Sequence, residues 1–400
     1  MTRLAIDGGR PVRSTPLPGW PAYGPEDIEA AGQVLASGRV NYWTGVHGRA
    51  FEDELAAAVG TRYAVAVANG TVALELALHA VGTGPGDEVI VPAATFVATA
   101  SAVVACGARP VVVDVDADTM TMTARTAAPA ITGRTAAIVV VHLAGHPADL
   151  EPLRALADDH HLPLVEDCAQ AHGASYRGRP VGGLGDIGAW SFCQDKIIST
   201  AGEGGAVTTS DPELWRRCWE RKDHGKSWAA VHEPPGPGFH WVHHDFGTNG
   251  RMTEIQAAVG RNQLRKLSAW TKQRTANAAV LIDTMRAEPA VHVPEPAEGA
   301  GHAYYRFYAR VRPRRLARGW DRDRLVAAVA AEGIPARQGG CMEVYRERAF
   351  RRFPDAPRIL PIAAELGRTC FSLPVHPTLE PSDVDDMAAA VVKVLREATA

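Results

Sequence analysis

The chain has 400 residues, 46% of them hydrophobic, and a formal net charge of −3. This length exceeds the size at which one hydrophobic core usually stops growing, so we expect a large domain and a smaller one. The mixed charges form no basic stripe, which argues against a nucleic-acid partner and favours a small-molecule substrate.

The sequence also indicates where the protein works. Its N-terminal residues lack the apolar segment of a signal peptide, and no stretch approaches the roughly 18 uninterrupted apolar residues that a membrane helix needs. The six cysteines have no Cys-x-x-Cys spacing and fall mostly within apolar or strand-like segments, which is typical of reduced, buried thiols. We therefore expect a cytoplasmic protein with no membrane partner.

Short apolar runs alternate with helix-length segments between about residues 60 and 210. The predicted strands are Tyr63 to Ala68, Glu88 to Val91, Pro110 to Val115, Ala137 to Val141, Pro163 to Glu166, Ile187 to Phe192 and Ala206 to Thr209. Near-continuous apolar strands separated by helices predict a largely parallel sheet that is covered on both faces. The predicted fold class is therefore α/β.

The first predicted strand ends in the turn Asn69-Gly70-Thr71, and a helical run from Val72 to Val81 follows. The free amide groups and the positive end of the helix dipole make such a turn an anion site, to which Thr71 adds a hydroxyl group. A phosphate group of a ligand would bind there. The alternative is that Thr71 only caps the helix.

Phe96 follows the strand that ends at Val91. Its ring could stack on a planar cofactor, although most aromatic residues in such places belong to the core.

Lys196 and Asp167 are the residues most informative about chemistry. Lys196 ends the segment Ser191-Phe-Cys-Gln-Asp-Lys196, a predicted strand end and turn, and the glycine-rich segment Gly202-Glu-Gly-Gly205 follows. Asp167 lies at the carboxyl end of another predicted strand, where open α/β sheets place their sites. A Schiff-base lysine with an acid for the pyridinium nitrogen is typical of pyridoxal phosphate (PLP) enzymes. The alternative is a solvated lysine and a helix-capping aspartate.

Two other patterns match known binding motifs, but the residues around them argue against such sites. The segment Gly183-Leu-Gly185-Asp-Ile-Gly188 matches the dinucleotide-binding pattern, but it precedes a strand instead of joining a strand to a helix. His142 and His146 have the spacing of metal ligands, but Gly145 and Pro147 argue against a helix that holds both on one face. We therefore predict neither a nicotinamide cofactor nor a metal.

The pattern changes beyond Arg261, where a long helix continues through Ala278 and leads into the loop from Val293 to Gly301. An alternating strand, Tyr304 to Val311, and a helix around Leu325 to Ala331 follow, and Ser382-Asp-Val-Asp385 resembles the capping box of a last helix. We predict an N-terminal arm (1–25), a large cofactor-binding α/β domain (26–270) and a small C-terminal α+β domain (271–400).

Taken together, these motifs resemble the sugar aminotransferase family called DegT/DnrJ/EryC1/StrS, within the PLP enzymes of fold type I. The resemblance covers nearly the whole chain. It is carried, in chain order, by Asn69-Gly70-Thr71, Gly84-Pro-Gly-Asp-Glu-Val-Ile-Val-Pro92, Thr95-Phe96, Glu166-Asp167-Cys-Ala-Gln170-Ala-His172-Gly173, Ser191-Phe192, Lys196, Gly202-Glu-Gly-Gly205 and Gly247-Thr-Asn249-Gly-Arg251-Met252.

The resemblance implies a role for each matching residue. Lys196 would form the Schiff base with PLP, Asp167 would pair with the pyridine nitrogen and Gln170 would contact the ring hydroxyl. Gly70, Thr71 and Ser191 would hold the phosphate, and Phe96 would cover one ring face. Asn249 would reach the phosphate of the neighbouring subunit, which implies a homodimer with shared sites.

The resemblance also implies the reaction. An amino group would pass from L-glutamate or L-glutamine to a keto group of a nucleotide-linked sugar, in a ping-pong transamination in which PLP alternates with pyridoxamine phosphate. Lys196 favours amino transfer, because members with histidine there are dehydratases. Candidate contacts for the acceptor are Arg39 to Gly45, Lys222 to Lys226 and His240-Trp241, with Lys226 or Arg251 meeting a diphosphate; a loop surface is the alternative.

Three other functions are compatible with these residues. The acceptor could be a free cyclitol ketone of the scyllo-inosose type, or the chain could resemble a 3-amino-5-hydroxybenzoate synthase, since these enzymes would share the cofactor residues. A more distant alternative is a non-catalytic regulator with the same fold. The intact pair Lys196 and Asp167 argues against it.

Overall fold

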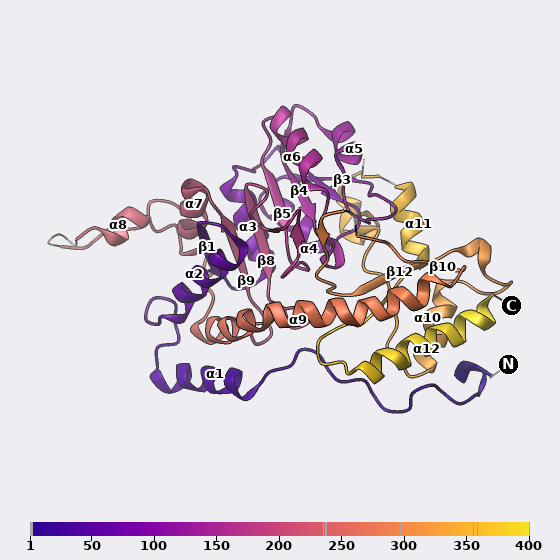
Figure 1. Cartoon of the computed structure of the whole chain (residues 1–400). Coiled ribbons are helices and arrows are strands. Elements are labelled where there is room, and N and C mark those ends of the chain that lie inside the picture. Colours follow the sequence, from indigo (N-terminus) through magenta and orange to yellow (C-terminus); the bar gives the residue numbers. More distant parts are fainter. Residues whose placement is uncertain are drawn as a thin grey trace.

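The structure is a computed structural model that describes residues 3–234, 236, 238–296, 298–354, 356–357 and 359–399. A large region built on a central sheet lies beside a smaller region at the C-terminal end of the chain, and the helix α9 (Glu254–Arg286) runs along both (Figure 1).

The central sheet contains the strands that the apolar runs predict. In spatial order they are β1 (Tyr63–Val67), β9 (Gly205–Thr209), β8 (Ile187–Ser191), β5 (Leu164–Asp167), β4 (Thr135–Val141), β2 (Glu88–Pro92) and β3 (Arg109–Val113). All neighbouring strands are parallel except β9, which is antiparallel to both β1 and β8. The prediction of a largely parallel α/β sheet is confirmed.

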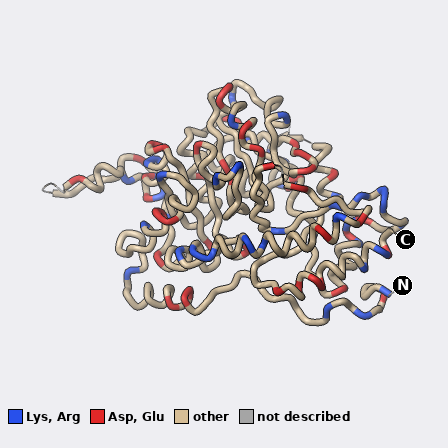
Figure 2. Tube along the Cα trace, viewed as in Figure 1, with Lys and Arg blue, Asp and Glu red and all other residues tan. Residues whose placement is uncertain are grey.

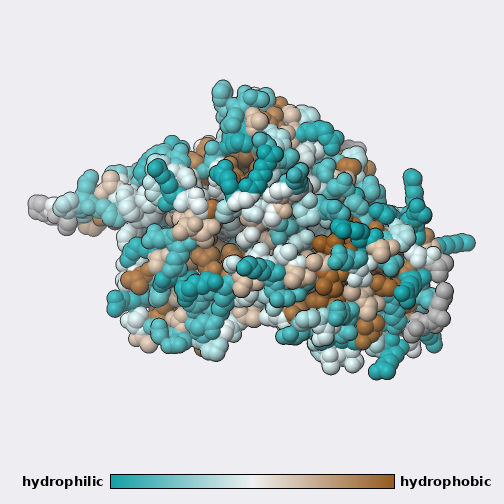
Figure 3. All heavy atoms as spheres, viewed as in Figure 1, coloured by the Kyte–Doolittle hydropathy of each residue, from teal (hydrophilic) through white to brown (hydrophobic). Residues whose placement is uncertain are grey.

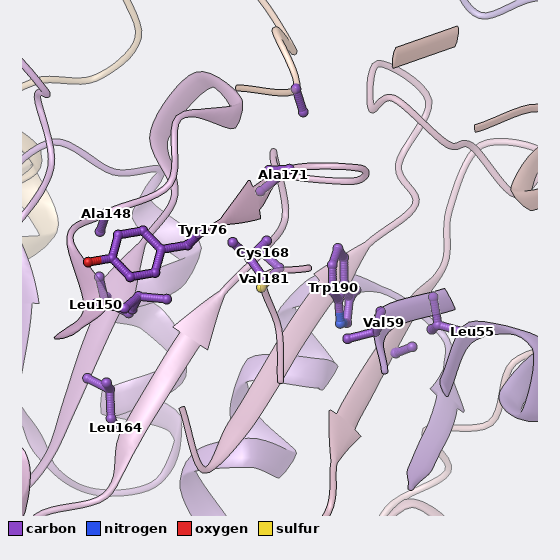
Figure 4. Close-up of a cluster of buried hydrophobic side chains, with 14 of the residues drawn as sticks. Leu55, Val59, Ala148, Leu150, Leu164, Cys168, Ala171, Tyr176, Val181 and Trp190 are labelled. Carbon is purple, nitrogen blue, oxygen red and sulfur yellow. The ribbon is translucent and has the colours of Figure 1, made fainter. Parts of the chain in front are cut away.

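Both faces of this sheet are buried, which explains why its strands are apolar almost throughout. Successive side chains of a strand point to opposite faces. Accordingly, Ala64 and Ala66 of β1 belong to one hydrophobic cluster, whereas Val65 and Val67 belong to the other. Figure 4 shows part of the first cluster, in which Trp190 and Tyr176 lie among small aliphatic side chains.

Helices cover the two faces. The helices that contribute several residues to the first cluster include α2 (His47–Val59) and α6 (Leu150–Asp159), and those of the second include α3 (Gly70–Ala80), α4 (Val97–Ala105) and α7 (Pro212–Lys222). The short helices α5 (Ala124–Ala127) and α8 (Trp228–His232) complete the region. The segment that contains α8 extends away from the body of the molecule (Figure 1).

The smaller region has its own antiparallel sheet and core. Its strands, in spatial order, are β10 (Val291–His292), β12 (Phe307–Val311), β14 (Cys370–Leu373) and β13 (Arg337–Gln338). Its helices are α10 (Arg322–Ala331), α11 (Pro361–Thr369) and α12 (Pro381–Ala398). The α+β character that the sequence predicts for this part of the chain is confirmed.

Two features predicted for the C-terminal part differ in detail from the structure. The predicted border loop contains β11 (Ala300–Gly301), which pairs with β6 (Ser175–Tyr176) and thereby with β7 (Arg179–Pro180), so this segment is fixed to the large region. Residue 297 of this loop lies outside the described residues.

The predicted capping box of the last helix was placed two residues too far along the chain. Helix α12 begins at Pro381, and the amide of Glu380 donates to the carboxylate of Asp383 at 2.8 Å. Proline is favoured at the first helical position because it has no N–H to satisfy there, so Glu380 and not Ser382 precedes the helix.

The helix α9 passes through the predicted domain boundary at residue 270 without a break. It packs against α1 (Pro25–Ser37) and α2 on one side of that position and against α12 and β10 on the other. The boundaries at 25 and 270 stay a prediction.

The N-terminal arm crosses the smaller region before it reaches the large one. Glu332 is fully buried and accepts hydrogen bonds from the amides of Ala5 and Val12, at 2.9 and 3.0 Å, while Lys393 forms an ion pair with it. Arg13 forms a further ion pair with Asp383 at 2.8 Å. Residues 5–13 are thereby attached to the C-terminal core.

The surface has the mixed character that the composition predicts. Positive and negative side chains are interspersed along the chain (Figure 2). Most of the visible face is hydrophilic, with apolar side chains gathered where α9 passes β12 (Figure 3). All six cysteines are unpaired thiols; Cys168, Cys218 and Cys370 are buried, but Cys341 is exposed, against the prediction that the thiols lie inside. Among the described helices, none is both long enough and apolar enough to span a bilayer.

Candidate active site

A cavity of about 720 Å³ lies at the carboxyl ends of β5 and β8, beside the first turns of α3 and α4. This is the edge at which open α/β sheets bind their ligands. Its polar and aromatic lining consists of Asn69, Thr71, Thr95, Phe96, Thr99, Asp167, Gln170, Trp190, Ser191, Cys193, Asp195, Lys196, Glu203 and Tyr305, and Gly70 also lines it. Every predicted cofactor residue except Asn249 is in this set.

The start of α3 forms one end of the cavity. Asn69, not Thr71, caps the helix, because its side-chain oxygen accepts a hydrogen bond from the amide of Val72 at 3.0 Å. Thr71 lies in the first turn, so the interpretation of Thr71 as the cap is wrong. The Thr71 hydroxyl therefore does not cap the helix. The free amides of the first turn form the positive end of the helix dipole.

Glycines allow this helix start to lie directly against the strand ends. A Cβ atom on Gly70 would lie 2.5 Å from the Cβ of Ser191, and one on Gly205 would lie 2.3 Å from the carbonyl oxygen of Asn69. Both distances are far below a permissible contact, so only glycine fits at either position. Gly70, Thr71 and Ser191 therefore form a compact cradle beside the N-terminus of α3, a position that favours an anion.

Asp167 ends β5 and is only 5% exposed. Its carboxylate accepts hydrogen bonds from the hydroxyl of Thr99 at 2.9 Å and from the amide of Ala169 at 3.1 Å. Burial raises the pKa of Asp167, while these hydrogen bonds and the charge of Lys196 act in the opposite direction. A buried carboxylate of this kind is well suited to a cationic partner such as a protonated ring nitrogen.

Lys196 lies on the turn after β8, as the sequence predicts, and is partly buried. Its amine lies 5.0 Å from the ring centroid of Tyr305, and the Tyr305 hydroxyl donates a hydrogen bond to the carboxylate of Asp195. The indole N–H of Trp20 donates to the Lys196 carbonyl oxygen at 2.8 Å. The lysine turn is therefore held by the N-terminal arm and by a residue that precedes β12.

Phe96 and Gln170 lie on two further sides of the cavity. Phe96 precedes α4 and is 65% exposed, so it is not a core residue and its ring is available to a planar ligand. The side-chain oxygen of Gln170 accepts a hydrogen bond from the amide of Ala144 at 2.6 Å. That bond fixes the orientation of the amide and leaves its nitrogen as the donor for a ligand oxygen.

Glu166, the neighbour of Asp167, explains the glycine pattern from 183 to 188. Its fully buried carboxylate accepts hydrogen bonds from the amides of Gly182, Leu184 and Gly185 at 2.8, 2.7 and 2.6 Å, and it contacts His142 at 3.1 Å. Burial opposes ionisation, but the bonds from His142 and the amides outweigh it and lower the pKa of Glu166. These amide groups bind a carboxylate of the protein itself and not a dinucleotide.

Asn249 lies outside this cavity. Its residue is exposed and forms an isolated β-bridge with Asp223. The candidate diphosphate contacts Lys226 and Arg251 both form ion pairs with the buried carboxylate of Asp223, at 3.1 and 2.6 Å, and Trp43 donates to the same carboxylate at 2.7 Å. Both cations thus contact the same carboxylate, which compensates one of their two positive charges.

Sequence reasoning missed Thr99 and Tyr305. Thr99 lies one helical turn after Thr95, and the two hydroxyls are 2.6 Å apart; this i, i+4 pair at the start of a helix is a weak signal. Tyr305 is 110 residues from its hydrogen-bond partner Asp195, and no local pattern indicates that contact.

The residues of the cavity fit PLP, judged by their chemistry. A lysine amine, a buried carboxylate, an anion cradle at a helix start and an exposed aromatic ring all face one space. Gly70 has no side chain, so none occupies the cradle at this position, whereas a Cβ atom there would clash with Ser191.

Comparisons with known proteins identify the family of the chain. Residues 21–392 match the DegT/DnrJ/EryC1/StrS aminotransferase family. An L-glutamine:2-deoxy-scyllo-inosose aminotransferase of Streptoalloteichus tenebrarius is 38% identical, covering 98% of this chain and 97% of the relative. A dTDP-3-amino-3,4,6-trideoxy-alpha-D-glucose transaminase of Streptomyces venezuelae is 39% identical, covering 93% and 92%. The crystal structure of an aminotransferase from Psychrobacter cryohalolentis superposes with a TM-score of 0.94 at 46% identity, covering 96% of this chain and all of that one.

Proposed function

Because this chain belongs to the DegT/DnrJ/EryC1/StrS aminotransferase family, we propose that it transfers an amino group from L-glutamate or L-glutamine to a keto group of a nucleotide-linked sugar. The protein is a PLP-dependent transaminase with the fold of its relatives. The observation that supports the proposal most is the convergence of Lys196, Asp167 and the cradle on one cavity.

We assign the cofactor contacts as follows. Gly70, Thr71 and Ser191 hold the phosphate, Asp167 pairs with the ring nitrogen and Gln170 donates to the ring oxygen. When bound, PLP supplies the electron sink that makes the α-proton of an amino acid removable.

Lys196 is the proton carrier of the reaction. Its Nζ removes a proton from the α-carbon of the donor in the first half-reaction, and it adds a proton to the former carbonyl carbon of the acceptor in the second. The two substrates use the same lysine in turn, which gives a ping-pong pattern. The contact with the Tyr305 ring and the bond from Trp20 keep this amine on the cavity side of its turn.

The other residues of the cavity position and shield the reacting groups. Thr99 and the amide of Ala169 hold the Asp167 carboxylate in one orientation. Phe96 covers the open side and excludes water from it. An ionised Asp167 is favoured once a positive charge lies opposite, since an opposite charge lowers the pKa that burial has raised.

The names of the relatives support two acceptors. The Streptomyces venezuelae relative is named for a dTDP-linked amino sugar, which supports the nucleotide-sugar acceptor. The Streptoalloteichus tenebrarius relative is named for 2-deoxy-scyllo-inosose and for L-glutamine, so a cyclitol ketone is the second candidate. In support of a site that can take either, Lys226 and Arg251 are paired with Asp223 and are not reserved for a diphosphate.

Absorption spectroscopy tests the first half of the proposal. The PLP-loaded protein is mixed separately with L-glutamate and L-glutamine, and the visible band of the bound cofactor is followed. Loss of the band identifies the donor. A coloured protein that neither donor bleaches would contradict the proposed donors, and a colourless protein would contradict the cofactor contacts.

An acceptor panel tests the second half. After bleaching, a dTDP-linked keto-sugar, a UDP-linked keto-sugar, 2-deoxy-scyllo-inosose and a cyclic keto acid are added in turn. Return of the band only with the nucleotide sugars supports the main proposal. Return only with the free cyclitol would replace it by the second candidate.

We also propose a homodimer in which Asn249 contacts the phosphate bound by the partner. In support, Asn249 is exposed on its own chain, and the neighbouring Phe239, Trp241 and Phe246 are 77%, 79% and 92% exposed, more than is usual for unpartnered aromatic residues. The cytoplasmic location stays a prediction.

Mixed dimers test this arrangement. Lys196→Ala and Asn249→Ala should each lose most activity, but a mixed dimer contains one intact site, so random mixing restores about a quarter of wild-type activity. Mixing without any recovery would contradict a shared site.

A further inference from the structure

A second cavity, of about 540 Å³, borders the candidate active site. Its walls come from Trp20 of the N-terminal arm, Arg274 of α9, the segment around Tyr305 and Arg306, and Arg337 of β13. Tyr305 and Asp195 line both this cavity and the one that contains Lys196. The two spaces are therefore neighbours on either side of Tyr305.

Arg274 is an unusual residue for the wall of a cavity. It is 1% exposed, and one of its terminal nitrogens donates to the carbonyl oxygens of Tyr304 and Tyr305 at 3.2 and 3.3 Å. Its Nε and its other terminal nitrogen have no hydrogen-bond partner among the described residues. Its guanidinium lies 4.9 Å from the ring centroid of Trp20, and burial lowers its pKa to about 9.

The charges around the cavity do not balance within the chain. Arg274, Arg306 and Arg337 face it with one carboxylate, Asp195. The Tyr305 hydroxyl already donates to Asp195, and Arg306 approaches it only to 3.9 Å. Arg274 is buried, Arg306 is half-buried and Arg337 is exposed. An anion that binds beside Arg274 stabilises its buried charge.

Another pair of cations, Lys226 and Arg251, contacts a buried carboxylate directly. Lys226 and Arg251 both contact the buried Asp223, at 3.1 and 2.6 Å, so each has a carboxylate at ion-pair distance. Two nitrogens of Arg274 have no hydrogen-bond partner among the described residues, and Arg306 approaches Asp195 only to 3.9 Å. The second cavity is thus the stronger candidate for an anionic group of a substrate.

We propose that this cavity binds the carboxylate of the amino donor, with Arg306 and Arg337 as its direct contacts and Arg274 as the buried positive charge behind them. The proposal rests on the proposed function and adds the group that selects the donor. Planar guanidinium groups match a carboxylate in shape and charge.

Position also favours the donor over the acceptor. The Tyr305 ring lies 5.0 Å from the Lys196 amine, and an α-carboxylate is two bonds from the amino group that has to reach the same place. Because Tyr305 and Asp195 line both cavities, a donor whose amino group lies beside Lys196 is next to the cavity that the arginines line.

The test uses the PLP-loaded variants Arg306→Gln, Arg337→Gln and their combination, with Arg314→Gln as the control, since Arg314 is an exposed arginine on the short helix from Pro313 to Arg315. Two quantities are measured: the donor concentration that half-saturates the bleaching rate, and the calorimetric affinity for glutarate, a dicarboxylate without an amino group. A charge-assisted hydrogen bond lost at such a site weakens binding by about 10- to 100-fold.

We expect each cavity variant to raise the half-saturating donor concentration and to weaken glutarate by that factor, without changing the maximal bleaching rate or the half-saturating acceptor concentration. Arg314→Gln should match the wild type. A loss of acceptor affinity instead would assign the cavity to a diphosphate and overturn the proposal, and so would an equal loss for both substrates, which indicates a structural role. If the wild type is not bleached at all, the proposed function fails, whereas bleaching with unchanged donor dependence in the variants refutes only the donor site.

Discussion

Replacing Glu166 by glutamine tests how the carboxyl end of β5 is held in place next to Asp167. One oxygen of the Glu166 carboxylate accepts from Leu184 and Gly185, and the other accepts from Gly182 and contacts His142. Glutamine keeps the first oxygen but puts an NH₂ group opposite the Gly182 amide, so two donors face each other. The lost charge-assisted bond costs about 1.5–3 kcal/mol, and the buried unsatisfied amide costs about 1–3 kcal/mol more.

The expected loss of stability is therefore about 3–6 kcal/mol, which is a large part of the total stability of a typical protein. With an unfolding entropy of about 2.1 cal/mol/K per residue, the 400-residue chain should lose roughly 4–7 °C in Tm. Differential scanning calorimetry of the two proteins at pH 7 measures this difference. The matched control is Glu151→Gln, because Glu151 forms an exposed ion pair with Arg177, and exposed ion pairs contribute about 0–1 kcal/mol.

The same experiment has a pH dependence of known sign. The pKa of Glu166 is lowered in the folded protein, so the stability that it contributes is present above the ordinary carboxyl pKa of about 4.3 and is lost as the pH falls below it. The gap in Tm between wild type and Glu166→Gln should narrow in acid. An unchanged Tm at pH 7, or a gap that widens in acid, would refute the reasoning that the ionised carboxylate holds the 182–185 loop.

Three further predictions follow from the site. Lys196→Ala should abolish the visible, borohydride-reducible cofactor adduct and turnover; repeated turnovers by this variant would contradict the role of the lysine. Gly70→Ala should lower PLP affinity by about 5- to 150-fold, because its Cβ would lie 2.5 Å from that of Ser191 and forcing extra atoms into a packed site costs about 1–3 kcal/mol. Equilibrium titration with PLP measures the affinity, with Gly84→Ala as the control in open space, and equal affinities would show that the cradle is not tight. Burial and the charges of Lys196 and Arg274 lower the pKa of His172 to about 3, so the free energy of unfolding should fall by about 1.4 kcal/mol per pH unit as the pH drops from about 6.5 towards 3. Urea unfolding of His172→Phe between pH 6 and 4 should lack this contribution to the pH dependence, and an unchanged dependence would exclude His172 as its source.

The sequence predicts the central sheet well because both faces of it are buried. Each strand is apolar almost throughout, and its limits are found to within about two residues of the prediction, as for Ile187–Ser191 against a predicted end at Phe192. Lys196 and Asp167 could be placed in one site for a related reason, since parallel strands bring their carboxyl ends to the same edge.

Other features depend on contacts that no local pattern records. Both Asn69 and Thr71 are good capping residues, and only the position of the helix start decides between them. Tyr305 and Arg274 reach the site from beyond residue 270, where the sequence shows only a strand and a helix. The context of the pattern from 183 to 188 argues against a dinucleotide motif, but the spacing does not indicate its partner Glu166.

The unbroken helix α9 has a mechanical consequence. A helix of its 33 residues is about 50 Å long, and a tilt of about 5° at one end moves the other end by about 4 Å. That displacement exceeds the length of any hydrogen bond in the active site. Part of the proposed substrate pocket lies on α9, so contacts along the whole helix have to hold it in position. Substitutions on the faces of α9 that meet α1 and α12 would therefore alter catalysis without contacting a substrate.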